Sequence, residues 1–167
     1  MVSPFEDRTT ARLCLRRPVL DDLSSFVAID SDPQTNLYRP GGAPSSERSA
    51  QTFREFLREW DAHGVGYWVV ELSDEVIGMA GVESQLFSNR SCWNLYYRLS
   101  PDVWGKGFAV EAANEAVAMA SATEPMWPVV ARTRPLNHAA AHVAMKAGLQ
   151  RRPELDVSGF EVFALGW

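Results

Sequence analysis

The chain has 167 residues, of which 46% are hydrophobic and 22% are charged, and this composition excludes a disordered or fibrous class. The length fits one folded domain over residues 1–167. A net charge of -5 argues against a broad electrostatic contact with nucleic acid, so any bound anion must be held locally. No run approaches the roughly 18 apolar residues of a membrane span, and the first residues lack the pattern of a signal peptide. The sequence therefore predicts a soluble cytoplasmic protein.

Residues 11–17 alternate polar and apolar side chains, which predicts a first strand. Apolar residues then recur at helical spacing from Pro18 to Asp30, which predicts a first helix. The segment 31–46 is rich in Pro, Gly and Ser and is long for a passive connection, so we expect a functional loop. Tyr38 in this loop either contacts a substrate or pins the loop to the core.

A second helix ends at His63-Gly64, because its apolar residues keep a helical period and glycine is a common residue at helix ends. Three strands follow at 66–72, 75–84 and 91–99, and their short connections predict antiparallel hairpins. The chain then changes to a β-α-β-α-β order. This second part contains the strand 91–99, a helix at 107–123, a strand at 128–134, a helix at 137–147 and a last strand at 160–165.

Cysteine and histidine give no sign of a metal site or a disulfide. Cys14 and Cys92 lie in apolar strand-like runs and do not form a Cys-x-x-Cys pair. His138 and His142 have the i, i+4 spacing of a zinc pair, but no third ligand is evident. We therefore predict no metal cofactor.

The stretch LSPDVWGKGFAVEA, residues 99–112, places a glycine turn between a strand and a helix. Backbone N–H groups at a helix start bind anions, and glycine lets a phosphate approach closely. A P-loop is excluded, because Lys106 is followed by Gly107 and Phe108 and no hydroxyl is available for magnesium. A dinucleotide fold requires a third glycine where Val110 stands. It also requires the motif near the start of the sheet, whereas about four predicted strands precede it here.

This stretch resembles the acyl-CoA-binding turn of the GNAT acetyltransferases, with its nearest likeness in the RimJ/RimL-like branch. The general pattern of that turn begins with Arg or Gln, and Trp104 takes this place here. A second segment, NHAAAHVAMKAGL at residues 137–149, resembles the family's Asn-x-Ala-Ser…Lys-x-Gly-Phe segment. Because both motifs occur in the family's order, the resemblance covers the chain from about residue 11.

The resemblance implies a mixed, mostly antiparallel α/β fold with a central sheet of six to seven strands and about four helices. The fourth and fifth strands would splay into a V that receives the pantetheine arm of acetyl-CoA. Residues implied to bind this co-substrate are Arg98, Leu99, Trp104, Gly105, Lys106, Gly107, Phe108, Ala109, Asn137 and Ala140.

The implied chemistry is direct attack of an acceptor amine on the thioester, with a backbone N–H near Leu99 stabilising the oxyanion. A Glu often occupies the family's place that matches Asn94, and Asn cannot act as a base. Glu83 on the neighbouring strand is then the best carboxylate, although it is equally consistent with an exposed charge at a hairpin end. The family's thiolate donors, a Ser and a Tyr, match Ala140 and Ala144 here.

Two functions stay open from the sequence. The first is an N-acetyltransferase acting on a small amine or a protein N-terminus, with Tyr38, Asn94 and Tyr96 in the acceptor pocket. The second is a non-catalytic acyl-CoA-binding or sensing domain, which the missing Glu and the two alanines favour. Dinucleotide binding is a third choice. A homodimer is left open.

Overall fold

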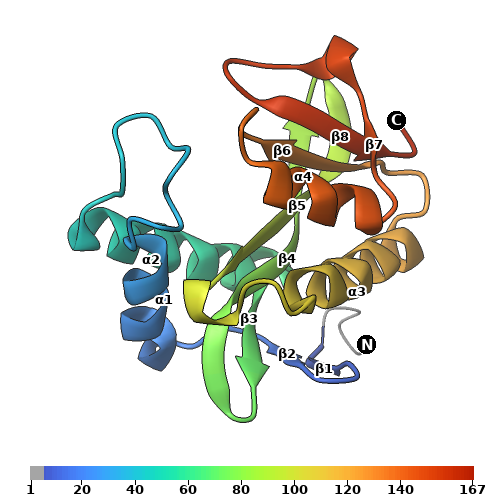
Figure 1. The fold of residues 1–167 in the computed structure, drawn as a ribbon. Helices are drawn as coiled ribbons and strands as arrows, with labels where there is room; N and C mark the ends of the chain where they lie inside the picture. Colours follow the sequence, from blue (N-terminus) through green and yellow to red (C-terminus); the bar gives the residue numbers. More distant parts are fainter. Residues whose placement is uncertain (1–5) are drawn as a thin grey trace.

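The computed structural model describes residues 6–167 and contains one mixed sheet with helices on both faces (Figure 1). The helices are α1 (Leu23–Asp30), α2 (Ser46–His63), α3 (Phe108–Thr123) and α4 (His138–Lys146). The strands are β1 (Arg8–Thr9), β2 (Cys14–Arg16), β3 (Tyr67–Leu72), β4 (Glu75–Phe87), β5 (Arg90–Leu99), β6 (Val129–Thr133), β7 (Gln150–Arg151) and β8 (Glu161–Leu165).

Neighbouring strands follow the order β1-β2-β3-β4-β5-β6-β8-β7, and every pair is antiparallel except β5 with β6. This confirms the predicted mixed α/β fold, with eight strands in the described residues in place of six to seven. The two strands that the sequence did not indicate, β1 and β7, have two residues each. A two-residue strand is too short to show the alternation of apolar and polar residues from which strands are predicted.

The two connections of the β3-β4-β5 meander form antiparallel hairpins, as predicted, and both turns have two residues. Ser73 and Asp74 both have positive φ, as do Ser88 and Asn89, which is the backbone of a two-residue type I′ turn. The second hairpin is longer than predicted, because β4 continues to Phe87. The Phe87 side chain is buried in a small apolar cluster with β6 and β8, and this packing extends the strand.

Two apolar clusters fix the two faces of the sheet. The larger one packs α3 and α4 against side chains such as Trp68 and Val82. The smaller one packs Phe26 of α1 and Phe53 of α2 against the opposite face. α2 ends as predicted, with Gly64 in the left-handed region, and at its start Ser45 accepts from the Arg48 N–H at 3.1 Å. The two faces of the sheet are therefore covered by different pairs of helices, α3 with α4 on one and α1 with α2 on the other.

Candidate active site

The centre of the sheet opens between β5 and β6, as predicted for the fourth and fifth strands. In the described chain the two strands pair only at Trp93 with Val129 and at Asn94 with Val130. Residues 95–99 of β5 have no strand paired with them on the side that faces β6. The open edge is a place where an extended ligand can add as a strand.

The alternation of backbone groups along β5 decides which of them face the opening. The Trp93 N–H donates to the Pro128 carbonyl on the β6 side, whereas the Ser100 N–H donates to Ile77 on the β4 side. By this period of two, the backbone groups of Tyr97 and Leu99 face the opening, and those of Arg98 face β4. The predicted contact with Leu99 fits this geometry. The predicted backbone contact with Arg98 does not.

The glycine turn lies at the start of α3, next to the end of β5. Gly105 and Gly107 have φ angles of 76° and 82°, in the left-handed region. Glycine adopts this region readily because it has no Cβ. No side chain caps the helix N-terminus, and the first helical hydrogen bond runs from Glu111 N–H to the Gly107 carbonyl. The N–H groups of Phe108 and Ala109 are therefore left for a ligand, and the exposed Lys106 adds charge beside them.

Arg12, which sequence reasoning missed, clamps this turn from the N-terminal segment. Its Nη1 donates to the Lys106 carbonyl at 2.9 Å, its Nε pairs with Glu111 at 2.7 Å, and its guanidinium lies 4.3 Å from the centre of the Phe108 ring. Burial raises the pKa of Glu111, but hydrogen bonds from Thr10 and Arg12 lower it below its usual value overall. The partners lie about a hundred residues apart, so no local pattern could have indicated the clamp.

Trp104 has a clear structural role in place of the Arg or Gln of the general pattern. Its indole Nε1 donates to the Leu99 carbonyl at 3.0 Å while the ring stays half exposed. This bond ties the glycine turn to the end of β5. It also occupies the Leu99 carbonyl, so the groups of this edge that remain for a ligand are the Leu99 N–H and the backbone of Tyr97.

The second motif forms the start of α4, as expected. The Asn137 side chain accepts from the Ala140 N–H at 3.1 Å, which makes it the N-cap and leaves its amide nitrogen as a donor. Ala144 is fully buried and carries no group that could donate a proton. The Tyr97 hydroxyl crosses to this helix and donates to the Ala140 carbonyl at 2.6 Å, and burial raises its pKa.

Glu83 lies within β4, directly opposite Asn94 of β5, and not at an exposed hairpin end. Its Oε1 is buried and accepts no hydrogen bond from any described side chain or backbone group. Asn94 donates through Nδ2 to the Tyr67 hydroxyl at 2.7 Å and accepts from Arg132 Nη2 at 3.2 Å. A carboxyl group with one buried, unpaired oxygen thus lies opposite Asn94, beside the opening of the sheet.

The environment of Glu83 raises the pKa of its carboxyl group above the value in water. Burial is the largest cause and raises the pKa of Glu83 to about 7, the charge of Glu59 raises it further, and the Tyr67 hydroxyl lowers it. Near neutral pH this carboxyl can therefore both accept and release a proton. The same burial raises the pKa of Tyr67, so its hydroxyl stays protonated.

The loop 31–45 is anchored by residues other than Tyr38. Asn36 is buried, and its Nδ2 donates to the carbonyls of Asp30 and Asp32 at 2.6 and 2.8 Å. Arg98 donates to the Thr35 carbonyl at 3.0 Å. Tyr38 itself is 40% exposed, so it does not pin the loop to the core.

Tyr96 belongs to the aromatic wall of the face that carries α1 and α2. Its ring stacks on Tyr67 at 4.6 Å and meets Phe56 edge-on at 5.8 Å. Asn94 and Arg98 lie two residues before and after Tyr96 in β5, so all three side chains are on the same face of the sheet. The residues predicted to meet an acceptor therefore lie on the face opposite α3 and its glycine turn.

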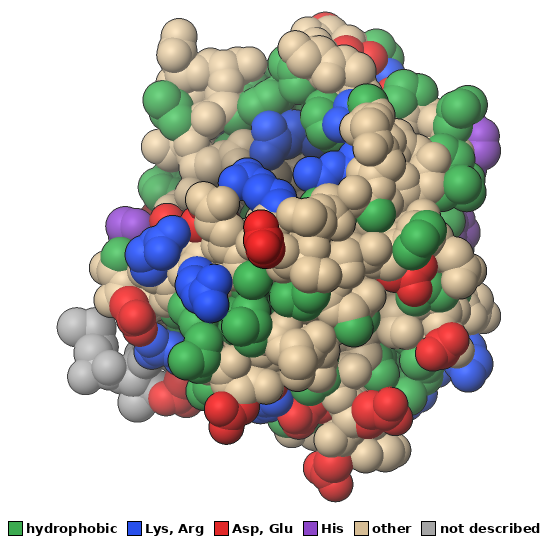
Figure 2. Space-filling model, turned by 90° about the vertical axis from the view of Figure 1, so that its left-hand side faces the viewer, with side chains coloured by type: hydrophobic (Ala, Val, Ile, Leu, Met, Phe, Trp, Pro, Cys, Tyr) green, Lys and Arg blue, Asp and Glu red, His purple; other side chains and the backbone are tan. Residues whose placement is uncertain are grey.

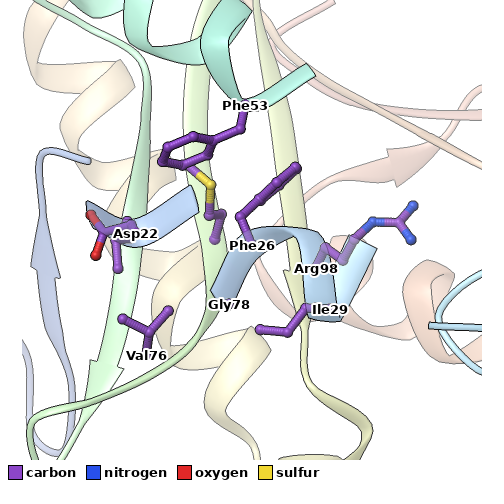
Figure 3. Close-up of a pocket in the computed structure, with 9 residues that line it drawn as sticks. Asp22, Phe26, Ile29, Phe53, Val76, Gly78 and Arg98 are labelled. Carbon is purple, nitrogen blue, oxygen red and sulfur yellow. The ribbon is translucent and has the colours of Figure 1, made fainter. Parts of the chain in front are cut away.

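A small cavity between α1 and the sheet is a packing defect of the core (Figure 3). Apolar side chains such as Phe26 and Ile29 line most of it. The two charged residues at its ends are already in ion pairs, Asp22 with Arg16 at 2.7 Å and Arg98 with Asp30 at 3.5 Å. This cavity therefore offers no free charged group to a ligand, whereas the opening between β5 and β6 has unpaired backbone groups.

Residues 12–150 match the acetyltransferase (GNAT) domain family, over most of the chain. The chain belongs to the GNAT acetyltransferase family. A solved acetyltransferase from Agrobacterium tumefaciens is similar in sequence and fold, with 25% identity and a TM-score of 0.82 over 96% of this chain and 94% of that one. The uncharacterized protein YkkB of Bacillus subtilis (strain 168) is 24% identical over 131 residues, 77% of this chain and 76% of its own.

The acetyltransferase fold is also shared with RimL, a ribosomal L7/L12 alpha-N-protein acetyltransferase whose solved structure contains coenzyme A. That structure has 13% identity and a TM-score of 0.74, over 96% of this chain and 97% of that one. At this identity the likeness shows the fold alone. Family membership thus gives acetyl transfer from acetyl-CoA as the activity class and leaves the acceptor and the branch of the family undecided.

No group of three or more His, Cys, Asp or Glu side chains in residues 6–167 could hold a metal ion. Within the same residues, no helix is long and apolar enough to cross a bilayer. Cys14 is half-buried and Cys92 is buried, and both are free thiols.

Proposed function

We propose that this chain is an N-acetyltransferase of the RimJ/RimL-like branch that transfers an acetyl group from acetyl-CoA to a primary amine, in a small molecule or at a protein N-terminus. The observation that carries the proposal is the open edge of β5 lying directly beside the uncapped N-terminus of α3. One site receives an extended amide-bearing arm, and the other receives an anion. The Leu99-Trp104 bond fixes their relative position.

The co-substrate would lie across both features. Its pantetheine amides would pair with the backbone of Tyr97 and with the Leu99 N–H. Its pyrophosphate would accept hydrogen bonds from the N–H groups of Gly105 to Ala109, with Lys106 adding charge. Asn137 would donate its amide nitrogen from the start of α4, with Ala140 beside it. In this arrangement, Gly107→Ala should weaken CoA binding, because a φ of 82° is unfavourable for alanine.

The acceptor would approach from the opposite face, and its neutral amine nitrogen would attack the thioester carbonyl carbon. The C–S bond breaks, the amide C–N bond forms, and the electron pair of the C–S bond leaves on sulfur. Glu83 takes the proton that the amine loses, because its carboxyl group titrates near neutral pH and its Oε1 has no other partner. The Leu99 N–H would stabilise the oxyanion.

The departing thiolate would be protonated by solvent. Ala140 and Ala144 stand where the family has a Ser and a Tyr, and neither can donate a proton. A thiol with a pKa near about 8.5 is a fair leaving group without help. Tyr38, Asn94 and Tyr96 would contact the acceptor.

A non-catalytic acyl-CoA-binding domain is the second candidate, favoured by Asn94 and by the two alanines of α4. Measuring CoA release from acetyl-CoA with a panel of amines separates the two. We expect turnover that rises as pH increases through about 7, the pKa of Glu83, and a large loss in Glu83→Gln. Tight CoA binding without turnover on any amine would leave the binding domain as the function. The cytoplasmic location and a homodimer stay predictions.

A further inference from the structure

Two guanidinium groups project from the end of β6 onto the acceptor face. Along β6, Val129 and Ala131 pack in the large cluster under α3 and α4, whereas Val130 packs on the opposite side. By this alternation Arg132 and Arg134 point to the side of Val130. The contact from Arg132 to Asn94 at 3.2 Å places its charge beside the opening of the sheet.

Neither guanidinium is neutralised by a carboxylate. Arg132 donates to the amide oxygens of Gln85 and Asn94, at 3.3 and 3.2 Å. Arg134 donates to the Gly159 carbonyl at 3.3 Å and lies 3.8 Å from the centre of the Phe160 ring. Neither appears in any ion pair between described residues, although other arginines of this acidic chain do. The two charges are therefore available to a ligand.

Because residue 94 is Asn, the Arg132 guanidinium meets a neutral amide oxygen there and no compensating carboxylate. A Glu in this position, as the family often has, would stand within hydrogen-bonding distance of the Arg132 guanidinium and neutralise it. The Asn amide satisfies one N–H and leaves the positive charge in place. Asn at position 94 therefore has two effects: the site lacks one carboxylate, and the positive charge of Arg132 stays available to a ligand.

The surface agrees with this arrangement. Figure 2 shows a hollow on the side of the molecule that carries the loop 31–45, with Lys and Arg side chains gathered around it. Arg132 is exposed and Arg134 is half-buried, so an incoming molecule can reach both. Since the whole chain has a net charge of -5, this basic hollow is a local feature. A recessed cluster of one sign concentrates ligands of the other sign.

We propose that the acceptor amine carries an anionic group, a carboxylate or a phosphate, which Arg132 and Arg134 bind while the amine faces Glu83. This inference rests on the proposed acetyl transfer and names the class of its acceptor. An amine with a nearby anion would satisfy both guanidinium groups and direct its nitrogen to the opening between β5 and β6. A polyamine would place positive charge against the same groups and be repelled.

The first test compares matched amines in the CoA-release assay, with rates corrected for the fraction of neutral amine. The pairs are L-amino acids with their carboxamides and O-phosphoethanolamine with ethanolamine, and spermidine is the cationic probe. We expect kcat/KM to be about tenfold higher for the anionic member of a pair, because one or two charge-assisted hydrogen bonds at a partly exposed site have about this effect. The two pairs distinguish a carboxylate from a phosphate.

The second test uses variants. Arg132→Gln and Arg134→Gln should each remove most of the preference for the anionic amine and leave the KM for acetyl-CoA unchanged. Arg90→Gln is the matched control, because Arg90 also has a neutral partner, Gly166, but lies at the far end of β5. Asn94→Glu should reverse the preference by neutralising Arg132. A CoA-induced rise in melting temperature, equal in all variants, shows that each is folded.

The possible results distinguish failure of the anionic acceptor from failure of acetyl transfer. Turnover on neutral amines and spermidine as fast as on anionic amines, or an undiminished preference in both arginine variants, overturns the anionic acceptor and leaves acetyl transfer standing. A rise in the KM for acetyl-CoA in the arginine variants, with the preference intact, assigns these residues to the cofactor and also overturns it. Absence of turnover on every amine, with CoA bound, defeats the proposed function itself.

Discussion

Replacing Glu83 by glutamine should stabilise this protein above neutral pH while it removes activity. The physical reason is that the buried carboxyl is held in a place that disfavours its charge, which raises its pKa from 4.5 to about 7. The folded state therefore keeps the proton over a pH range in which the unfolded chain has lost it. Such a group contributes stability that is fully present below pH 4.5 and is lost as pH rises through about 7.

The magnitude follows from the two pKa values. The loss of stability from this one group is about 2 kcal/mol at pH 6 and about 3.4 kcal/mol at pH 8.5, relative to strongly acidic solution. A neutral glutamine does not titrate, so the difference between Glu83→Gln and the wild type should grow by about 1.4 kcal/mol over this range. All other titrating groups are common to both proteins and cancel.

The assay is urea unfolding of both proteins at pH 6 and pH 8.5, followed by tryptophan fluorescence. Both pH values avoid the isoelectric point near 5.2, where solubility is lowest. Glu124→Gln is the matched control, because Glu124 is exposed at the end of α3. A difference between Glu83→Gln and the wild type that is the same at both pH values would refute the reasoning, since it would mean that folding does not raise the pKa of Glu83.

Three further substitutions test the scaffold of the site. Trp104→Phe removes the hydrogen bond to the Leu99 carbonyl and should weaken CoA binding about fivefold by calorimetry, with little change in melting temperature. Gly107→Ala forces alanine to a φ of 82° and should cost about 1–2 kcal/mol, seen as weaker CoA binding and lower stability; unchanged CoA affinity would remove this turn from the cofactor site. Asn36→Ala releases two backbone carbonyls and should cost about 2 kcal/mol, with faster chymotryptic cleavage after the exposed Tyr38 than in the wild type; an unchanged cleavage rate would show that other contacts hold the loop.

Much of the site lies outside the reach of sequence patterns, because it consists of contacts between distant segments. Arg12 gave no signal, since its partners at Lys106 and Glu111 follow about a hundred residues later. Glu83 could be named as a carboxylate, but its burial depends on the helices packed over that face. Arg98 was placed with the cofactor because it sits beside Leu99, whereas the alternation of β5 turns its backbone to β4 and its side chain to Thr35.

Local patterns were enough to predict the order and approximate ends of the long elements, the two hairpins and the glycine turn at Gly105 and Gly107. These features depend on local periodicity and on which residues tolerate a positive φ, and both are written in a few neighbouring residues. Folding alone sets the exact point at which β5 and β6 part, the raised pKa of Glu83 and the placement of Arg132 and Arg134 on one face. Those depend on strand pairing and on desolvation by segments far apart in the chain, and such long-range packing has no local signature.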